Sequence, residues 1–324
     1  MSRPRVYIHR VEHCTSEMYM DAANEALLAS FADVTDHGTR AEPMPHEAMV
    51  EALQGATAIL SLNGSCAEEI TTDVLREVGT VRVGAISHWW HVCHDRAGAM
   101  WRDAGVHVID ASDACNEAVA EWTLGAAIAG LRPFDLFDRQ MKAGVIWPER
   151  HGVAGQLIGS TFGIVGLGRV GRLVAKFLRP FGTRVIAFDA FTSQADAADL
   201  GVELVDLDTL LKTADVISLH LAVTPETRGI IGARELALIK DGALVVNSAR
   251  AALLDNQAFR AELAKKRFRA YLDVFEPEPP PPDDILRSLD NVVLTPHVAG
   301  HTDQMFLNCG RKAIEALRDF FATP

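Results

Sequence analysis

Three polar residues in the second half of the chain have side chains suited to proton transfer and anion binding. Arg250, Glu278 and His297 each follow shortly after an apolar run that is expected to form a strand. Histidine titrates near neutral pH, so His297 could exchange a proton with a hydroxyl group. A carboxylate beside the imidazole would favour its protonated form and fix the ring orientation. An arginine can grip a carboxylate as a planar fork and polarise a neighbouring oxygen. The set therefore suits hydride transfer at a carbon that bears oxygen.

Each of these residues also has a simpler interpretation. Arg250 could be a surface cation, Glu278 a solvated loop acid and His297 an interdomain histidine with satisfied hydrogen bonds. The catalytic interpretation gains support from their placement after strands, because open α/β sheets bind ligands at the carboxyl ends of their strands. It requires that the three side chains meet at one edge of a sheet.

A glycine motif of the dinucleotide-binding type follows the apolar run 162–165 and opens the helical pattern 172–178. Its first glycine allows a tight turn, its second a close approach of the backbone to a pyrophosphate, and its third close packing of helix on strand. The start of the helix offers unpaired N–H groups to phosphates. The candidate pyrophosphate-binding residues are Gly166, Gly168, Arg169, Val170 and Gly171.

The next predicted strand, 185–188, ends in Asp189, which could accept hydrogen bonds from both hydroxyls of an adenosine ribose. A 2′-phosphate there would meet like charge, at a cost of about 4 kcal/mol for two charges 4 Å apart at an effective dielectric near 20. Residues 190–203 contain no Lys or Arg that would offset this repulsion. The sequence therefore favours NAD over NADP as the cofactor.

The pattern of apolar runs predicts two doubly wound α/β domains with parallel sheets. A chain of 324 residues with 48% hydrophobic content is long enough for two cores. A single helix is expected from Asn116 to about Met141, and an irregular loop around Pro277 and 279–282, where proline excludes regular structure. Residues 303–321 resemble an amphipathic helix that could pack on the first domain. The predicted strands are 6–9, 58–62, 81–85 and 106–110 in the first domain, and 162–165, 184–188, 216–220, 243–247, 269–273 and 292–294 in the second.

The net charge of −12 has the wrong sign for binding nucleic acid or an anionic membrane surface. Five scattered cysteines without C-x-x-C spacing favour a reduced, cytoplasmic protein. The start of the chain has too short an apolar run for a signal peptide, and no stretch approaches the roughly 18 to 20 apolar residues of a membrane span. The expected partner is a small molecule.

Taken together, these motifs resemble the D-isomer-specific 2-hydroxyacid dehydrogenase family. The similarity extends from about Asn116 to His301, and several motifs follow one another in the family's order, which makes chance similarity improbable. The motifs are Asn116-Glu117-Ala118-Val119-Ala120-Glu121, 163–171, Ser218-Leu219-His220, Thr224-Pro225-Glu226-Thr227, 273–279 and Thr295-Pro296-His297-Val298-Ala299-Gly300.

The resemblance implies a Rossmann NAD-binding domain, residues 116–296, inserted in a flavodoxin-like substrate domain, residues 1–115 and 297–324. It implies that Arg250 binds and activates the substrate, that Glu278 rather than Glu276 supports the base, and that His297 is the acid/base. Asp273 would hold the nicotinamide carboxamide. His220 and Ala249 would also line the cofactor site. Family members are commonly homodimers with the segment after Asn116 at the interface, so a homodimer is expected.

The chain departs from the family pattern at two places. Ala251 follows the catalytic arginine where glycine is usual, and only a local backbone adjustment is expected. The loop after the predicted strand 81–85, usually rich in Gly and Asp in the family, here contains Trp89 and Trp90. These tryptophans could line the substrate pocket and favour a bulkier side chain, or they could pack in the core or at a subunit contact.

Two further signals in the first third of the chain concern the substrate and a metal. Asn63, Gly64 and Ser65 match the place where the family holds the substrate carboxylate with backbone N–H groups, although Gly and Ser also mark ordinary turns. The residues His88, His91, Cys93 and His94 do not have the spacing of a closed zinc site, so no metal is expected.

The predicted protein is therefore an enzyme, an NAD-dependent D-2-hydroxyacid dehydrogenase or 2-oxoacid reductase. Two alternatives stay open, an NAD-sensing regulator with little turnover and a phosphite-type dehydrogenase. Formate-oxidising relatives replace the supporting acid with glutamine, so Glu278 argues against formate. The residues do not define the side chain of the 2-hydroxy acid.

Overall fold

The computed structural model of the chain describes residues 3–11, 16–64, 66–87, 93–149 and 154–323. It divides into two compact units, which we treat separately. The first unit comprises Met1–Cys115 and His301–Pro324, and the second comprises Asn116–Gly300. His297, which was expected to begin the return to the first domain, lies within the second unit.

The first unit contains a five-stranded parallel sheet with the strand order β2-β1-β3-β4-β5. Its strands are β1 (Arg5–His9), β2 (Asp33–Asp36), β3 (Ala58–Ser61), β4 (Val83–Ile86) and β5 (His107–Asp110). Four of them were predicted from apolar runs. The prediction missed β2, since its sequence Asp-Val-Thr-Asp is mostly exposed and has no apolar run.

Helices cover this sheet, and the last helix of the chain is one of them. A Cβ at Gly310 in this helix would lie 2.0 Å from the Tyr19 carbonyl oxygen, so only glycine permits the close approach. The Asn24 side-chain amide donates to the carbonyl oxygens of Tyr19 at 2.8 Å and Leu307 at 2.9 Å. The helices of the first unit are α1 (Ser16–Tyr19), α2 (Ala22–Phe31), α3 (His46–Ala52), α4 (Thr72–Val78), α5 (Cys93–Asp103) and α13 (Asp303–Ala322), with the short 3-10 helices η1 (Ala67–Glu69) and η2 (Ser112–Cys115).

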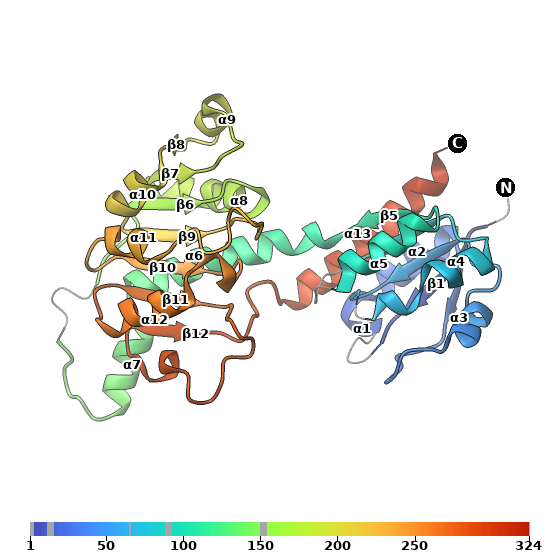
Figure 1. The fold of residues 1–324 in the computed structure, drawn as a ribbon, viewed down its shortest axis with the longest axis horizontal. Coiled ribbons are helices and arrows are strands. Elements are labelled where there is room, and N and C mark those ends of the chain that lie inside the picture. Colours follow the sequence, from blue (N-terminus) through green and yellow to red (C-terminus); the bar gives the residue numbers. More distant parts are fainter. Residues whose placement is uncertain (1–2, 12–15, 65, 88–92, 150–153, 324) are drawn as a thin grey trace. The chain divides into compact units, whose positions relative to one another are not determined.

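The second unit contains a seven-stranded parallel sheet with the strand order β12-β11-β10-β9-β6-β7-β8 (Figure 1). The chain builds outward from β6 and then returns to place β9 on the other side of β6, which creates a topological switch point of the kind that binds dinucleotides. The strands are β6 (Thr161–Val165), β7 (Arg184–Phe188), β8 (Glu203–Leu204), β9 (Val216–Leu219), β10 (Leu244–Asn247), β11 (Arg269–Leu272) and β12 (Val292–Leu294). Six were predicted, and β8 is too short to give a periodic signal.

Alternating side chains of these strands enter two separate cores. In β10, Val245 packs on one face with helices α10, α11 and α12, whereas Leu244 and Val246 pack on the other with α6 and α8. Both faces of a parallel sheet are normally covered in this way. The helices are α6 (Asn116–Leu131), α7 (Phe134–Lys142), α8 (Arg169–Leu178), α9 (Gln194–Asp199), α10 (Leu207–Thr213), α11 (Ala233–Leu238) and α12 (Asn256–Ala264), with the 3-10 helices η3 (Arg179–Phe181), η4 (Ala251–Leu253) and η5 (Ile285–Ser288). The predicted fold class of two parallel α/β sheets is confirmed.

The prediction of one helix from Asn116 to about Met141 was wrong. The chain forms α6 and then α7, and Pro133 lies at the start of the second helix. Proline has no N–H to donate and disfavours helical geometry at the residue before it, so the first helix ends there. Among the helices in the described ranges, none is both long and apolar enough to cross a membrane.

Candidate active site

The glycine turn after β6 has the close contacts that a dinucleotide cradle requires. Gly166 has φ of +101°, and a Cβ there would lie 2.8 Å from the carbonyl carbon of His220. A Cβ at Gly171 would lie 2.2 Å from the Gly166 carbonyl oxygen. Any larger residue at this position would therefore prevent α8 from packing as closely on the turn as it does. Gly168 is exposed and has open space around its Cβ position, where a phosphate could approach the backbone. Arg169 and Val170 form the first turn of α8 beside it.

Asp189 lies at the carboxyl end of β7 and is tied to the glycine turn. Its carboxylate accepts hydrogen bonds from the backbone N–H groups of Leu167 at 2.8 Å, Phe191 at 2.9 Å and Thr192 at 2.8 Å. Burial alone would raise the pKa of Asp189, but these three donors lower it below its ordinary value. The group is therefore ionised at neutral pH, as the binding of ribose hydroxyls requires. These contacts fit NAD.

His220 follows β9 and lies against the same turn. Burial of the ring lowers its pKa to about 4, so the ring is neutral at pH 7. Its Nε2 atom lies 2.6 Å from the hydroxyl of the buried Ser218. A neutral ring held at the switch point can line a cofactor site without adding charge there.

The structure pairs the predicted acid/base with the predicted supporting acid. The Nδ1 atom of His297 lies 2.5 Å from Oε1 of Glu278, and both side chains keep more than a third of their surface exposed. His297 has φ of +56°, a left-handed conformation that is uncommon for a residue other than glycine. Such a conformation persists only where the surrounding contacts hold it.

Asp273 supplies contacts that hold this conformation. Its side chain is fully buried, and its carboxylate accepts bonds from the Thr295 hydroxyl at 2.5 Å and the backbone N–H groups of Val298 and Ala299, both at 2.8 Å. The bonds bracket His297 on both sides. The expected contact of Asp273 with a nicotinamide carboxamide remains a prediction.

Arg250 follows β10, and the turn that carries it is fixed by Asn247. The buried Asn247 side chain accepts from the Ala249 N–H at 3.0 Å and donates to the Arg250 carbonyl at 3.1 Å. The exposed Arg250 guanidinium donates to the Ala249 carbonyl at 2.7 Å. Ala251 is not among the residues with positive φ, so the turn does not require the glycine that is usual there.

Strand register brings the three predicted catalytic residues to one edge of the sheet. Strands β10, β11 and β12 are neighbours, with Asn247 paired to Leu272 and Leu272 paired to Leu294. The three strands therefore end level, and Arg250, Glu278 and His297 lie on the segments that follow them. This is the carboxyl edge, where α/β sheets bind ligands.

The segment that leads to Glu278 has a brace that the sequence did not indicate. Oε2 of Glu276 accepts from the Asn256 amide at 3.2 Å, and its Oε1 lies 3.5 Å from the Arg228 guanidinium. Arg260 donates to the Glu276 carbonyl at 3.3 Å and forms a part-buried pair with Asp284 at 2.7 Å. The Glu276 carboxylate is thus engaged by Asn256 and Arg228, whereas Glu278 is the acid that contacts His297.

The predicted substrate segment of the first unit is described in part. Asn63 is partly buried, and Gly64 is buried with φ of +69° at the turn after β3. Ser65, Trp89 and Trp90 lie outside the described residues, as do His88 and His91.

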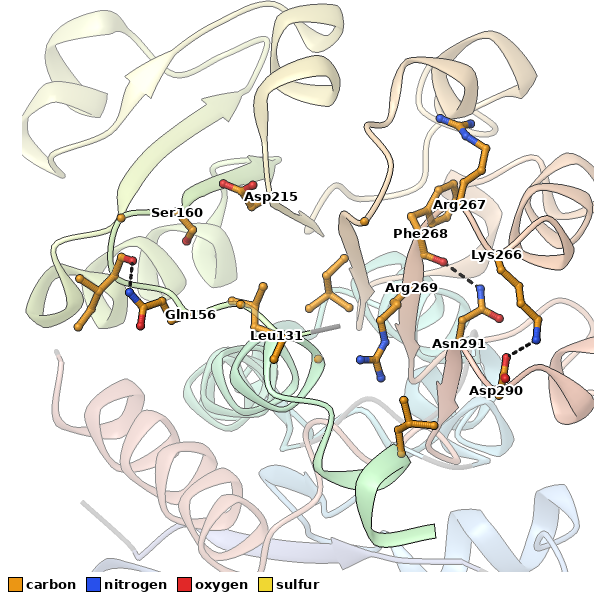
Figure 2. Close-up of a pocket in the computed structure, with 18 residues that line it drawn as sticks. Leu131, Gln156, Ser160, Asp215, Lys266, Arg267, Phe268, Arg269, Asp290 and Asn291 are labelled. Atoms are coloured by element: carbon orange, nitrogen blue, oxygen red, sulfur yellow. Dashed lines mark hydrogen bonds and ion pairs between the residues drawn. The ribbon is translucent and has the colours of Figure 1, made fainter. Parts of the chain in front are cut away.

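A cavity of about 590 Å³ lies at the opposite, amino edge of the second unit's sheet (Figure 2). It is lined by residues at or next to strand starts, including Ser160, Asp215, Leu244, Arg269 and Asn291. Its Lys266 and Asp290 pair with each other at 2.7 Å. Because the catalytic candidates all follow strand ends, this cavity is not the candidate active site.

Comparison with known proteins identifies the family. Residues 124–299 match the model of the D-isomer specific 2-hydroxyacid dehydrogenase NAD binding domain. The chain is 42% identical over 207 residues to a D-3-phosphoglycerate dehydrogenase of Archaeoglobus fulgidus, a match that covers 64% of this chain and 39% of that protein. It is 32% identical to a glyoxylate reductase of Aeropyrum pernix over 99% of this chain and 93% of that protein.

A solved structure, the TT0316 protein of Thermus thermophilus, matches with a TM-score of 0.75 and 29% identity over 98% of this chain and 97% of that one. The resemblance inferred from the motifs is confirmed, and so is NAD as the cofactor. The chain therefore belongs to the D-isomer specific 2-hydroxyacid dehydrogenase family, with its NAD-binding domain in the second unit.

Proposed function

We propose that this protein transfers a hydride between NAD(H) and C2 of a small 2-hydroxy or 2-oxo acid, with specificity for the D-isomer. The observation that carries the proposal is the 2.5 Å contact between His297 and Glu278 at the carboxyl edge of an NAD-binding sheet. A bound NAD would supply the hydride acceptor or donor. The protein must then exchange a proton with the C2 oxygen and bind the substrate carboxylate.

His297 would accept and donate the hydroxyl proton. Because Glu278 engages Nδ1, we assign proton exchange with the C2 oxygen to Nε2 of the same ring. In the oxidation direction the neutral imidazole takes the hydroxyl proton, and in reduction the imidazolium returns it. Glu278 stabilises the charged ring and fixes its orientation.

Arg250 would bind the substrate carboxylate and polarise the C2 oxygen. The turn held by Asn247 fixes its backbone, while the exposed guanidinium keeps the freedom to meet a ligand. We assign the remaining carboxylate contacts to the backbone around Asn63 and Gly64. In this proposal residues 1–115 and 301–324 form the substrate domain, and residues 116–300 carry the cofactor.

A homodimer is part of the proposal. Large apolar side chains are exposed on α7 and the segment after it: Phe134, Met141, Val145, Ile146, Trp147 and Ile158, with Ile146 at 89% exposure. Apolar surface gathered in one segment marks an interaction site. Because members of the family are commonly homodimers, we propose that a second copy of the chain covers this surface.

The test is the oxidation of NADH, followed by its fluorescence, with a panel of 2-oxo acids that includes glyoxylate, hydroxypyruvate and branched or aromatic acids. We expect turnover with at least one acid and preference for NADH over NADPH, because Asp189 is ionised. NADH binding without turnover of any acid would instead favour the regulatory alternative. Phosphite is included as a substrate with NAD to test the remaining alternative.

A further inference from the structure

A buried polar network lies at the carboxyl edge of the first unit's sheet, outside every residue assigned so far. His9 and Ser61 end the neighbouring strands β1 and β3, lie opposite each other in the register, and have fully buried side chains. Nδ1 of His9 lies 3.0 Å from the Ser61 hydroxyl, and Nε2 lies 2.9 Å from Oε1 of Glu69. The Glu69 side chain is only 4% exposed.

Arg40 and a backbone amide complete the network around Glu69. The Arg40 guanidinium contacts both carboxylate oxygens, with Nη1 at 3.2 Å from Oε2 and Nη2 bonded to Oε1. The Met44 N–H donates to Oε2 at 2.5 Å. Burial alone would raise the pKa of Glu69, but these donors and His9 lower it to about 2. Glu69 is therefore an acceptor only, and His9 donates to it through Nε2.

A buried charged network of this kind is an inefficient source of folding stability. Removing two opposite charges from water costs about as much as their attraction returns, and an apolar group of similar shape is often as stable. What a satisfied buried network does provide is a single geometry for the backbone that carries it. The question is which part of the backbone this network fixes.

Glu69 ends the segment that begins at Asn63 and Gly64. The chain leaves β3 at Ser61, turns at Gly64, and enters η1, where Glu69 is the last residue. Cys66 in this segment has φ of +55°, a strained value for a residue other than glycine. The β-ladder holds one end, since Leu62 N–H donates to the His9 carbonyl at 3.1 Å. Glu69 holds the other end.

We propose that Glu69, together with His9 and Arg40, is a positioning residue that fixes the Asn63–Gly64 turn for the substrate carboxylate. This inference rests on the proposed function. A loop held in its binding geometry before the ligand arrives does not spend binding energy on ordering. Loss of the anchor should therefore weaken substrate binding more than it slows the chemical step.

The test compares Glu69→Gln with wild-type protein and with a matched control, Glu77→Gln. Glu77 also pairs with a histidine, His46, at 2.8 Å in the same unit, but both side chains are exposed. We expect Glu69→Gln to raise KM for the 2-oxo acid about tenfold, with kcat and the Kd for NADH changed less than twofold. Glu77→Gln should change none of these values. An unchanged KM in a folded Glu69→Gln protein would overturn the inference.

A second readout separates this inference from the proposed function, because it needs no substrate. Hydrogen exchange followed by mass spectrometry should show faster exchange in Glu69→Gln for peptides that cover Asn63 and Gly64, and unchanged exchange for peptides of α8. If exchange is unchanged, Glu69 is not the anchor, whichever substrate the enzyme takes. Should Glu69→Gln not fold, Ser61→Ala keeps the carboxylate–arginine pair and removes only the hydroxyl beside His9. It should increase exchange at the same turn, and its failure to do so would overturn the inference.

Discussion

At the scale of single residues, His297 is the group on which the proposed reaction depends. Replacement of His297 with alanine should lower kcat by roughly 10²-fold or more, because it removes the proton donor and acceptor. The control is His46→Ala, which breaks an exposed histidine–glutamate pair of similar length elsewhere. Steady-state kinetics with the best acid of the panel measure both variants. Near-normal turnover by His297→Ala would contradict the assignment of His297 as the acid/base.

Asp273 should matter through the turn that it holds. Asp273→Asn places an amide N–H against a backbone N–H of Val298 or Ala299, so a buried donor loses its acceptor. Such a loss costs about 1–3 kcal/mol. Urea denaturation should show this loss of stability, and steady-state kinetics should show a lower kcat. The control is Asp103→Asn, which removes the acid of an exposed pair with Arg76 and should change neither value. A weaker Kd for NADH with stability unchanged would favour the carboxamide contact instead.

Glu69 gives the protein a specific sensitivity to acid. Its pKa is about 2 in the folded protein against 4.5 for the free group, so the folded state favours the ionised form. The resulting stability, up to about 3 kcal/mol, is complete above about pH 4.5 and is lost as pH falls toward 2. Unfolding measured at pH 6, 4 and 3 should show a gap between wild type and Glu69→Gln that narrows with acid. A constant gap would contradict this account.

At the scale of elements, the packing of α8 on the glycine turn is the contact least tolerant of change. Gly171→Ala would place a methyl group 2.2 Å from the Gly166 carbonyl oxygen and push the helix from the strand. We expect at least a tenfold weaker Kd for NADH and a stability loss of about 1–3 kcal/mol. Gly125→Ala is the control, since its Cβ would meet no atom within 4 Å in α6 and should stabilise the helix slightly. Fluorescence titration measures both.

The sequence predicted most strands because their apolar runs are continuous, as expected for strands covered on both faces. It missed β2, which is polar, and β8, which is only two residues long. It also extended the helix that begins at Asn116 past Pro133, where the structure has two helices. Element type follows from local pattern, but the end of a helix depends on a single residue within that pattern.

The candidate site was predictable only where local motifs define it. Arg250, Glu278 and His297 could be proposed from motifs and strand ends. The anchoring of the His297 turn by Asp273 could not be predicted, nor could the pairing of His9 with Glu69, since each joins residues far apart in sequence. Such contacts depend on strand register and loop path, which no local pattern encodes.

At the scale of the whole molecule, the exposed apolar segment of α7 and the residues after it should control assembly. Ile146→Asp places a charge at a side chain that is 89% exposed, so the single chain should stay folded while a dimer is disrupted. Light scattering should give a mass near 35.2 kDa for the variant and twice that for wild type. Ile285→Asp, at another exposed isoleucine of the second unit, should remain dimeric. A monomeric wild type would contradict the homodimer.

The membership of α13 in the first unit has a consequence for biosynthesis. Asn24 and Tyr19 need Leu307 and Gly310 as partners, yet the ribosome adds these residues only after all of the second unit. The chain therefore contains every residue of the NAD-binding unit before the final helix of its neighbour begins. A chain truncated near residue 300 would keep the second unit whole and leave the first unit without α13, so the apolar side chains that pack against this helix would be uncovered.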